Sequence, residues 1–208
     1  FEVGPDTLWN NSWWYDPVFL GRYPEDGLKH FGAHLPPSWE NDLAEMSPPL
    51  DFVGTNIYMG EPVRAGADGR PEIITYPVGS PITAFKWTLT PSSLRWGPHF
   101  LHERYQLPVI ITENGMSNTD WVHVDGTVPD PQRIDFLRRY LGELARGISD
   151  GADVRGYFHW SFLDNFEWAE GYKERFGLVH VDYTTLKRTP KQSFAFYREV
   201  IRSRGAAL

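Results

Sequence analysis

The sequence predicts an α/β fold in which parallel strands alternate with the helices that connect them. Three apolar or β-branched segments, at residues 50–58, 107–112 and 154–160, alternate with stretches of helical periodicity. The segment at 107–112 is almost continuously apolar, which is typical of a strand covered on both faces. A strand, loop and helix repeated three times predict parallel strands joined by right-handed crossovers.

A helix is predicted after each strand, beginning where a capping residue precedes a proline. A Thr or Asp side chain accepts a backbone N–H at the cap, and proline suits the first helical position. The three pairs are Thr90-Pro91, Asp130-Pro131 and Thr189-Pro190. Gly151 is well placed to end the second helix. The apolar stripes of the second and third helices are Ile134, Leu137, Leu141, Leu144 and Ile148, and Phe194, Tyr197, Val200 and Ile201.

The first 49 residues differ from the rest, because they are aromatic and rich in proline and glycine. They predict one long loop with a single short helix near residues 25–31. Long polar and aromatic loops also follow the predicted strands, and in a β/α barrel such loops hold the active site. A barrel needs eight strands and about 250 residues. With three strands in 208 residues, the chain forms either an open sheet or part of a barrel.

Composition excludes several classes of function. The net charge is −7, with 27 acidic and 20 basic residues and no basic stretch, which argues against nucleic-acid binding and a polybasic membrane anchor. No apolar run approaches the roughly 18 residues of a membrane span. The absence of cysteine excludes disulfides and thiolate chemistry, and no metal or organic cofactor is implied. The compartment stays open, with the cytoplasm as the favoured expectation.

The chain contains nine tryptophans, and aromatic residues make up 15% of it. One interpretation is a tryptophan-rich core, in which each indole N–H needs a hydrogen-bond partner. The other is a set of flat platforms that stack on the apolar faces of sugars. Composition alone leaves both interpretations open.

Chemically reactive side chains gather where the second and third predicted strands end. Glu113 lies at the tip of the second strand, where barrel enzymes place catalytic groups, although a carboxylate there is also suited to capping the following loop. Gly115 allows a sharp turn just after it. The third strand runs into residues 160–178, where carboxylates, amides and indoles crowd together. That composition favours a binding loop, with an interface loop as the alternative.

Several motifs resemble those of glycoside hydrolase family 1, in the order in which that family has them. Residues 111–115 (ITENG) resemble its nucleophile signature, and residues 160–168 and 171–178 resemble its sugar-binding signature. Residues 51–58 are similar to its strand-six motif, and residues 15–17 and 21–24 also match. The resemblance implies a retaining β-glucosidase. Residues 1–208 would form the C-terminal portion of a single (β/α)8 TIM-barrel catalytic domain, with strands six to eight but not the N-terminal strands.

The resemblance also implies roles for the catalytic residues. Glu113 matches the nucleophile, which attacks the anomeric carbon and forms a covalent glycosyl-enzyme. Tyr58 matches the tyrosine whose hydroxyl touches that carboxylate and orients it. Asn56 matches a polar residue beside the same subsite.

The implied substrate-binding residues lie mostly in the loop after the third strand. Trp160 would stack under the glucose ring, Glu167 would accept hydrogen bonds from the O4 and O6 hydroxyls, and Trp168 would donate to O3. Phe176 would line the O6 end of the pocket, and Trp87 would face the aglycone. A buried carboxylate that pairs with sugar hydroxyls discriminates strongly against sugars that lack them.

The chain also departs from the family pattern. Ile57 stands where many members have an aromatic residue, and His159 before the tryptophan is less usual. We expect His159 to be packed inside the protein and His123 to be solvent exposed rather than to contact the leaving group.

The family's acid/base glutamate lies in a Thr-x-Asn-Glu-Pro motif, which this chain lacks. Retaining hydrolysis needs two carboxyl groups, and neither Asp164 nor Glu170 has a feature that promotes it to the missing role. The chain alone is therefore expected to hydrolyse unactivated β-glucosides poorly or not at all. Its expected partners are a β-glucoside or small oligosaccharide and the N-terminal part of the same barrel. The alternative is a catalytically incomplete fragment that serves only as a sugar-binding or scaffold unit.

Overall fold

A parallel sheet of three strands in the order β1-β4-β5 forms the centre of the molecule. The structure is a computed structural model that describes residues 10–208 except 68 and 70. The strands are β1 (Val53–Asn56), β4 (Val109–Asn114) and β5 (Val154–His159), as the apolar segments predicted. Both strand pairs are parallel, so the predicted α/β class is confirmed.

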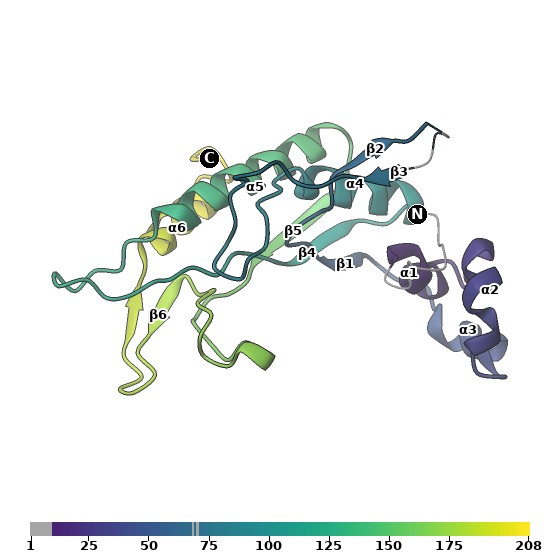
Figure 1. Cartoon of the computed structure of the whole chain (residues 1–208), viewed down its shortest axis with the longest axis horizontal. Helices are drawn as coiled ribbons and strands as arrows, with labels where there is room; N and C mark the ends of the chain where they lie inside the picture. The colour runs from purple at the N-terminus through teal and green to yellow at the C-terminus, as the bar shows by residue number, and fades with distance from the viewer. Residues whose placement is uncertain (1–9, 68, 70) are drawn as a thin grey trace.

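Three helices cover one face of this sheet (Figure 1): α4 (Ser93–Tyr105), α5 (Pro131–Ser149) and α6 (Gln192–Arg202). Each follows one strand, and α5 packs between the other two. The core between sheet and helices is apolar, with Val53, Val109, Ile111 and Leu137 fully buried. Of the predicted stripes, Leu141, Leu144 and Val200 are also buried, whereas Ile148 and Ile201 are exposed.

The predicted helix ends are correct for α5 only. This helix begins at Pro131 and ends before Gly151, whose φ of +105° is one that glycine adopts readily. The Asp130 side chain does not cap it. Instead, that carboxylate accepts hydrogen bonds from the backbone N–H and hydroxyl of Ser193, at 2.8 and 2.5 Å, and contacts Arg133.

The other two predicted caps are wrong. Helix α4 begins after Ser92, and the Thr90 hydroxyl does not cap it but accepts a hydrogen bond from the backbone N–H of Gly60. Thr189 and Pro190 belong to strand β7 (Arg188–Pro190), which pairs with β6 (Val179–Val181), so α6 begins only after Lys191. In both places a tertiary or strand partner outweighs the local capping pattern.

The N-terminal part is more helical than predicted. The short helix α2 (Glu25–Phe31) is present, but so are α1 (Asn11–Phe19), α3 (Trp39–Met46) and the 3-10 helix η1 (Gly32–His34). Helix α1 carries Pro17, which obscures its pattern. It is anchored through Asp16, whose carboxylate accepts hydrogen bonds from Arg104 and Tyr105 of α4 at 2.8 Å each.

The remaining elements are short and lie in the loops. Strands β2 (Val63–Ala65) and β3 (Pro71–Ile73) form a hairpin that projects beside α4, and the 3-10 helix η2 (Trp168–Glu170) lies in the loop after β5 (Figure 1). No helix among the described residues is long and apolar enough to cross a membrane.

No helix covers the second face of the sheet in the described part of the chain (Figure 1). Its side chains are exposed: Phe52 is 46% exposed and Phe158 is 60% exposed, and Asn56 and Thr112 are exposed as well. In a closed barrel this is the inner surface, which is packed with side chains. The open face and the free edges of β1 and β5 are what a part of a barrel presents.

Candidate active site

The carboxylate of Glu113 lies at the end of the central strand and pairs with a phenol from the neighbouring strand. The Tyr58 hydroxyl, just beyond β1, donates a hydrogen bond of 2.7 Å to Glu113 Oε2. Burial, together with this bond and the nearby carboxylate charges of Glu113 and Glu167, raises the pKa of Tyr58. The phenol therefore keeps its proton and acts as donor. Among the described residues, no second hydrogen bond reaches the Glu113 carboxylate, which leaves its other oxygen available for chemistry.

Asn114 ties the three strand ends together beside this pair. Its side-chain N–H donates to the backbone carbonyl of Ile57 at 2.8 Å, and its oxygen accepts a hydrogen bond from the Tyr157 hydroxyl at 2.8 Å. Asn114 is fully buried. Asn114 had no role assigned from sequence, although its place between Glu113 and Gly115 is a usable signal. It holds β1 and β5 in fixed register with the strand that carries Glu113.

Glycine is required at position 115 because the next loop crosses at close range. A Cβ there would lie 1.9 Å from the carbonyl oxygen of Trp160, which is a severe clash. The backbone N–H of Trp160 donates to the carbonyl of Asn114 at 2.8 Å. The loop after β5 is therefore held directly against the residues that follow Glu113.

Three aromatic rings form a wall beside Tyr58. Its ring centroid lies 5.1 Å from that of Trp87 and 6.3 Å from that of Phe176. Phe85 completes the wall, 4.4 Å from Trp87 and 5.8 Å from Phe176. Trp87 and Phe176 were both assigned to the site from sequence, and the structure brings them together around Tyr58. Phe85 was missed, because a single aromatic in a loop gives no signal of its own.

Trp160 and Glu167 meet across the loop after β5. The indole N–H of Trp160 donates to Glu167 Oε2 at 3.2 Å, which orients both side chains. At the base of the same loop, the backbone N–H of Ser161 donates to the carbonyl of Phe176 at 3.1 Å. A flat indole beside a carboxylate is an arrangement that suits a sugar ring and its hydroxyls.

Two of the residues assigned from sequence lie apart from these contacts. Trp168 is 78% exposed. The amide oxygen of Asn56 accepts a hydrogen bond of 2.6 Å from the Thr112 hydroxyl, on the open face of the sheet, and the residue is exposed. Their assignment to substrate binding stays a prediction.

The histidines behave as expected from sequence. Burial, reinforced by the positive charge of Arg133, lowers the pKa of His159 to about 3, so its ring is neutral. Neither ring nitrogen has a hydrogen-bond partner among the described residues. His123 is exposed and stacks on Trp121, with ring centroids 5.4 Å apart.

A cavity of about 860 Å³ opens along the free edge of β1, between α1 and α4. Tyr15, Ile57, Trp96 and Phe100 line it, and Glu113 does not. It is therefore a space beside the sheet edge rather than the site around Glu113. Among the described residues, no cluster of His, Asp and Glu side chains is able to hold a metal ion.

Comparison with known proteins agrees with these features. Residues 5–206 match the sequence profile described as glycosyl hydrolase family 1. Beta-glucosidase A of Thermotoga maritima is 40% identical over 191 residues, and a beta-glucosidase of an Agrobacterium species is 41% identical over 196 residues. These matches cover 91% and 90% of this chain but only 43% and 42% of the two relatives.

The fold agrees as well. A solved structure of the Thermotoga maritima beta-glucosidase in complex with castanospermine superposes with a TM-score of 0.84 at 39% identity. The superposition covers 94% of this chain and 44% of that enzyme. The chain thus spans less than half the length of the relatives it matches.

Proposed function

Because this chain belongs to glycosyl hydrolase family 1, we propose that it supplies the nucleophile-bearing part of a retaining β-glucosidase. The observation that carries the proposal is the 2.7 Å hydrogen bond from Tyr58 to Glu113 at the ends of adjacent strands. A protonated phenol that binds one carboxylate oxygen fixes the other for attack. The relatives named above are beta-glucosidases, and their names support this substrate class.

The proposed reaction has two steps. In the first, a lone pair of Glu113 attacks the anomeric carbon, and the bond to the leaving oxygen breaks with its electrons on that oxygen, which a general acid protonates. In the second, water attacks the anomeric carbon and gives its proton to the same acid/base group, and Glu113 leaves as a carboxylate. The two carboxyl groups of such enzymes lie about 5–5.5 Å apart.

The glycone subsite of the proposal lies in the loop after β5. Trp160 provides the stacking surface, and Glu167 accepts hydrogen bonds from sugar hydroxyls, with Trp168 and Asn56 as further contacts. Trp87 and Phe176 close the side next to Tyr58. The indole N–H of Trp160 already orients the Glu167 carboxylate at 3.2 Å. The carboxylate therefore loses little conformational entropy when the sugar binds.

The acid/base carboxyl is proposed to come from the strands that this chain does not supply. The open face of the sheet and the free edge of β1 are where those strands would pack. Without the acid, hydrolysis of unactivated glucosides loses about 10²–10⁴-fold in rate. Aryl glycosides with good leaving groups need little protonation and are expected to be less affected.

The competing function is a sugar-binding or scaffold unit without catalysis. It uses Trp160 and Glu167 but has no need for Tyr58 and Glu113 in hydrogen-bond contact. That contact therefore favours the enzyme.

Replacing Glu113 with Gln tests the proposal. The assay uses a completed enzyme, in which this chain is joined to the N-terminal barrel segment of the Thermotoga maritima relative. We expect Glu113→Gln to abolish turnover of an aryl β-glucoside while glucose binding, measured by calorimetry, persists. Glu170→Gln, an exposed carboxylate in the same region, is the matched control and keeps full turnover. Undiminished turnover in Glu113→Gln would overturn the assignment of the nucleophile.

A further inference from the structure

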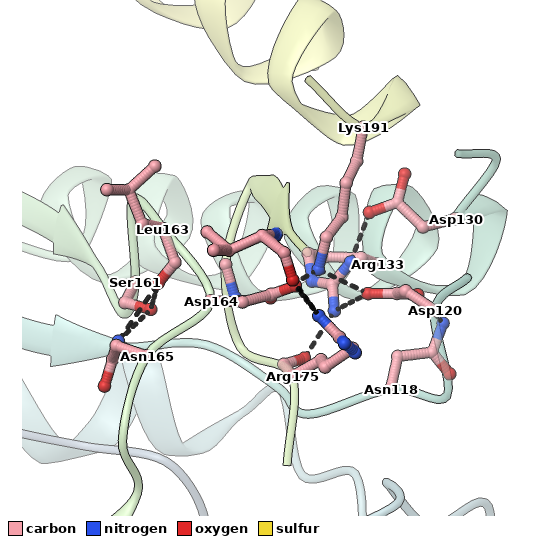
Figure 2. A network of polar contacts seen from close by, with 12 residues as sticks. Asn118, Asp120, Asp130, Arg133, Ser161, Leu163, Asp164, Asn165, Arg175 and Lys191 are labelled. Atoms are coloured by element: carbon pink, nitrogen blue, oxygen red, sulfur yellow. Dashed lines mark hydrogen bonds and ion pairs between the residues drawn. The ribbon is translucent and has the colours of Figure 1, made fainter. Parts of the chain in front are cut away.

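A network of charged side chains connects the loop after β4 with the loop after β5 (Figure 2). Its members are Asp120, Asp130, Arg133, Asp164, Arg175 and Lys191. Three carboxylates face three cations, so the network is electrically balanced. The side chains of Arg133, Asp130, Asp164 and Lys191 are completely buried. Such a group is costly to desolvate and is stable only when each charge is paired in a defined geometry.

Lys191 joins two separate loops through one atom. Its Nζ lies 2.6 Å from Asp120 Oδ2 and 2.8 Å from Asp164 Oδ1. Figure 2 shows its side chain extending from the segment before α6 toward Asp120, Arg133 and Asp164. Its backbone N–H donates to the carbonyl of Leu178 at 2.9 Å, so the root of the side chain is fixed as well.

One of the two loops follows the strand that carries Glu113, and the other carries the proposed glycone subsite. Asp120 lies in the loop that begins just after Glu113, and Asp164 lies between Trp160 and Glu167. The Asp164 carboxylate also accepts the backbone N–H of Gly177 at 3.0 Å. A Cβ at Gly177 would lie 2.1 Å from the backbone nitrogen of Asp164. The backbone segments around Asp164 and Gly177 are therefore in tight contact.

The other cations reinforce the same connection. Arg133 binds Asp120 at 2.7 Å and donates to the carbonyl of Arg175 at 2.9 Å. Arg175 binds Asp164 Oδ2 at 2.6 Å, next to Phe176 in the aromatic wall. In the loop after β5, the network therefore lies within a few residues of the proposed glycone-binding side chains.

We propose that Lys191 is a positioning residue, which sets the glycone-binding Glu167 opposite the nucleophile Glu113 by holding Asp120 and Asp164 on one ammonium group. This proposal rests on the proposed function. Directional ion pairs suit such a role better than apolar contacts, because they select one arrangement of two loops. Lys191 touches no reacting atom and acts through the loops.

The test compares Lys191→Met with Arg104→Met in the completed enzyme. Arg104 pairs with the buried Asp16 and joins α1 to α4, so its loss weakens the protein at a place that touches neither loop. The readout is the ratio of kcat/KM for an aryl β-glucoside to kcat/KM for the same glucoside lacking the O4 hydroxyl. That ratio measures the contribution of Glu167, and Glu167→Gln is included to establish how far it falls.

We expect Lys191→Met to lower this ratio by about tenfold or more, toward the value of Glu167→Gln, because a displaced carboxylate no longer recognises O4. Arg104→Met is expected to lower Tm while keeping the wild-type ratio. A Lys191→Met enzyme with the wild-type ratio would overturn the proposal, even if its Tm falls. If Glu113→Gln remains active, the proposed function fails instead, so the two failures are distinct.

Lys191→Met removes a fully buried charge, so a milder pair of variants guards against loss of folding. Asp120→Asn keeps the size of the side chain that Lys191 contacts, and Asp16→Asn is its matched control at the α1–α4 junction. The ratio is expected to fall in Asp120→Asn and to stay unchanged in Asp16→Asn. An equal ratio in the two would contradict the role of the network.

Discussion

The two faces of the β1-β4-β5 sheet are covered to very different extents. On one face, Val53, Val109 and Ile111 are completely buried under α4, α5 and α6. On the other, Phe52 and Phe158 are 46% and 60% exposed. The same three strands therefore pack into a buried core on one side and expose both apolar and polar side chains on the other.

This difference shows which part of the structure is self-sufficient. The helix-covered face is satisfied by residues within the chain, because each strand is followed by its own helix. Along each strand, alternate side chains point to the open face, as they point to the interior of a barrel. We expect this face to be covered by strands that the chain does not contain. The proposed catalytic residues lie at the carboxyl ends of these strands, at the border between the covered face and the open face.

Truncating one apolar side chain on each face gives the largest contrast. Leu137→Ala, in the covered core, is expected to lower the free energy of unfolding by about 2–5 kcal/mol. Phe158→Ala, on the open face, is expected to lower it by less than about 1 kcal/mol in this chain alone. Urea unfolding monitored by circular dichroism measures both.

In the completed enzyme, the substitution on the open face is expected to have a larger effect than in the chain alone. There, Phe158→Ala is expected to cost about 3 kcal/mol or more, because the ring becomes buried under the added strands. An equal cost in the chain alone and in the completed enzyme would mean that the open face is not an interface.

Tyr58→Phe is expected to separate activity from stability at the boundary between the faces. The variant loses the hydrogen bond to Glu113, which is worth about 1.5–3 kcal/mol for a charged acceptor. We expect kcat of the completed enzyme to fall by about 10- to 100-fold, while Tm changes little. Tyr183→Phe is the control, because it keeps the ring and removes a hydroxyl that donates a hydrogen bond of 3.4 Å to the backbone carbonyl of Asn165. A wild-type kcat in Tyr58→Phe would show that the phenol does not orient the carboxylate.

His159 is expected to make stability depend on acid. Its pKa is about 3 in the folded protein and near 6.5 when unfolded, so the unfolded chain binds one more proton between these values. The contribution of the neutral ring is complete above about pH 6.5. It is lost as the pH falls toward about 3, at about 1.4 kcal/mol per pH unit.

The comparison of wild type with His159→Gln isolates this effect. The difference in unfolding free energy between the two proteins is expected to shift in favour of the variant on going from about pH 7.5 to about pH 5. A pH-independent difference would mean that folding does not lower the pKa of His159.

The smallest effect is expected for Thr112→Val on the open face. The exposed hydroxyl donates to Asn56 at 2.6 Å, and its loss is expected to change the unfolding free energy by less than about 0.5 kcal/mol. A loss of more than about 2 kcal/mol, measured by urea unfolding, would show that side chains on the open face already stabilise the chain alone.

Periodicity predicted the repeating strand and helix units because each strand packs against a helix close to it in sequence. It could not predict helix caps whose partners are distant: Asp130 binds Ser193, 63 residues away, instead of its own helix. Helix α1 was missed because Pro17 obscures its pattern, although Asn10 caps it locally and Arg104 of α4 anchors its Asp16.

Those residues of the candidate site that lie within recognisable sequence motifs could be predicted. The contact between Tyr58 and Glu113 was expected and is confirmed by the structure. Lys191 could not be found this way, because a lysine before a helix is ordinarily exposed and only the fold reveals its burial between two carboxylates. Phe85 likewise joins the wall only through tertiary contact.

Covalent trapping determines whether this chain carries the nucleophile of a retaining glycosidase. The reagent is a dinitrophenyl β-glucoside in which fluorine replaces the C2 hydroxyl. Fluorine slows both steps and the good leaving group restores the first, so the glycosyl-enzyme accumulates. We predict that peptide mapping of the completed enzyme finds the sugar on Glu113, and that Glu113→Gln stays unlabelled. A label on another carboxylate, or equal labelling of Glu113→Gln, would contradict the assignment of Glu113 as the nucleophile.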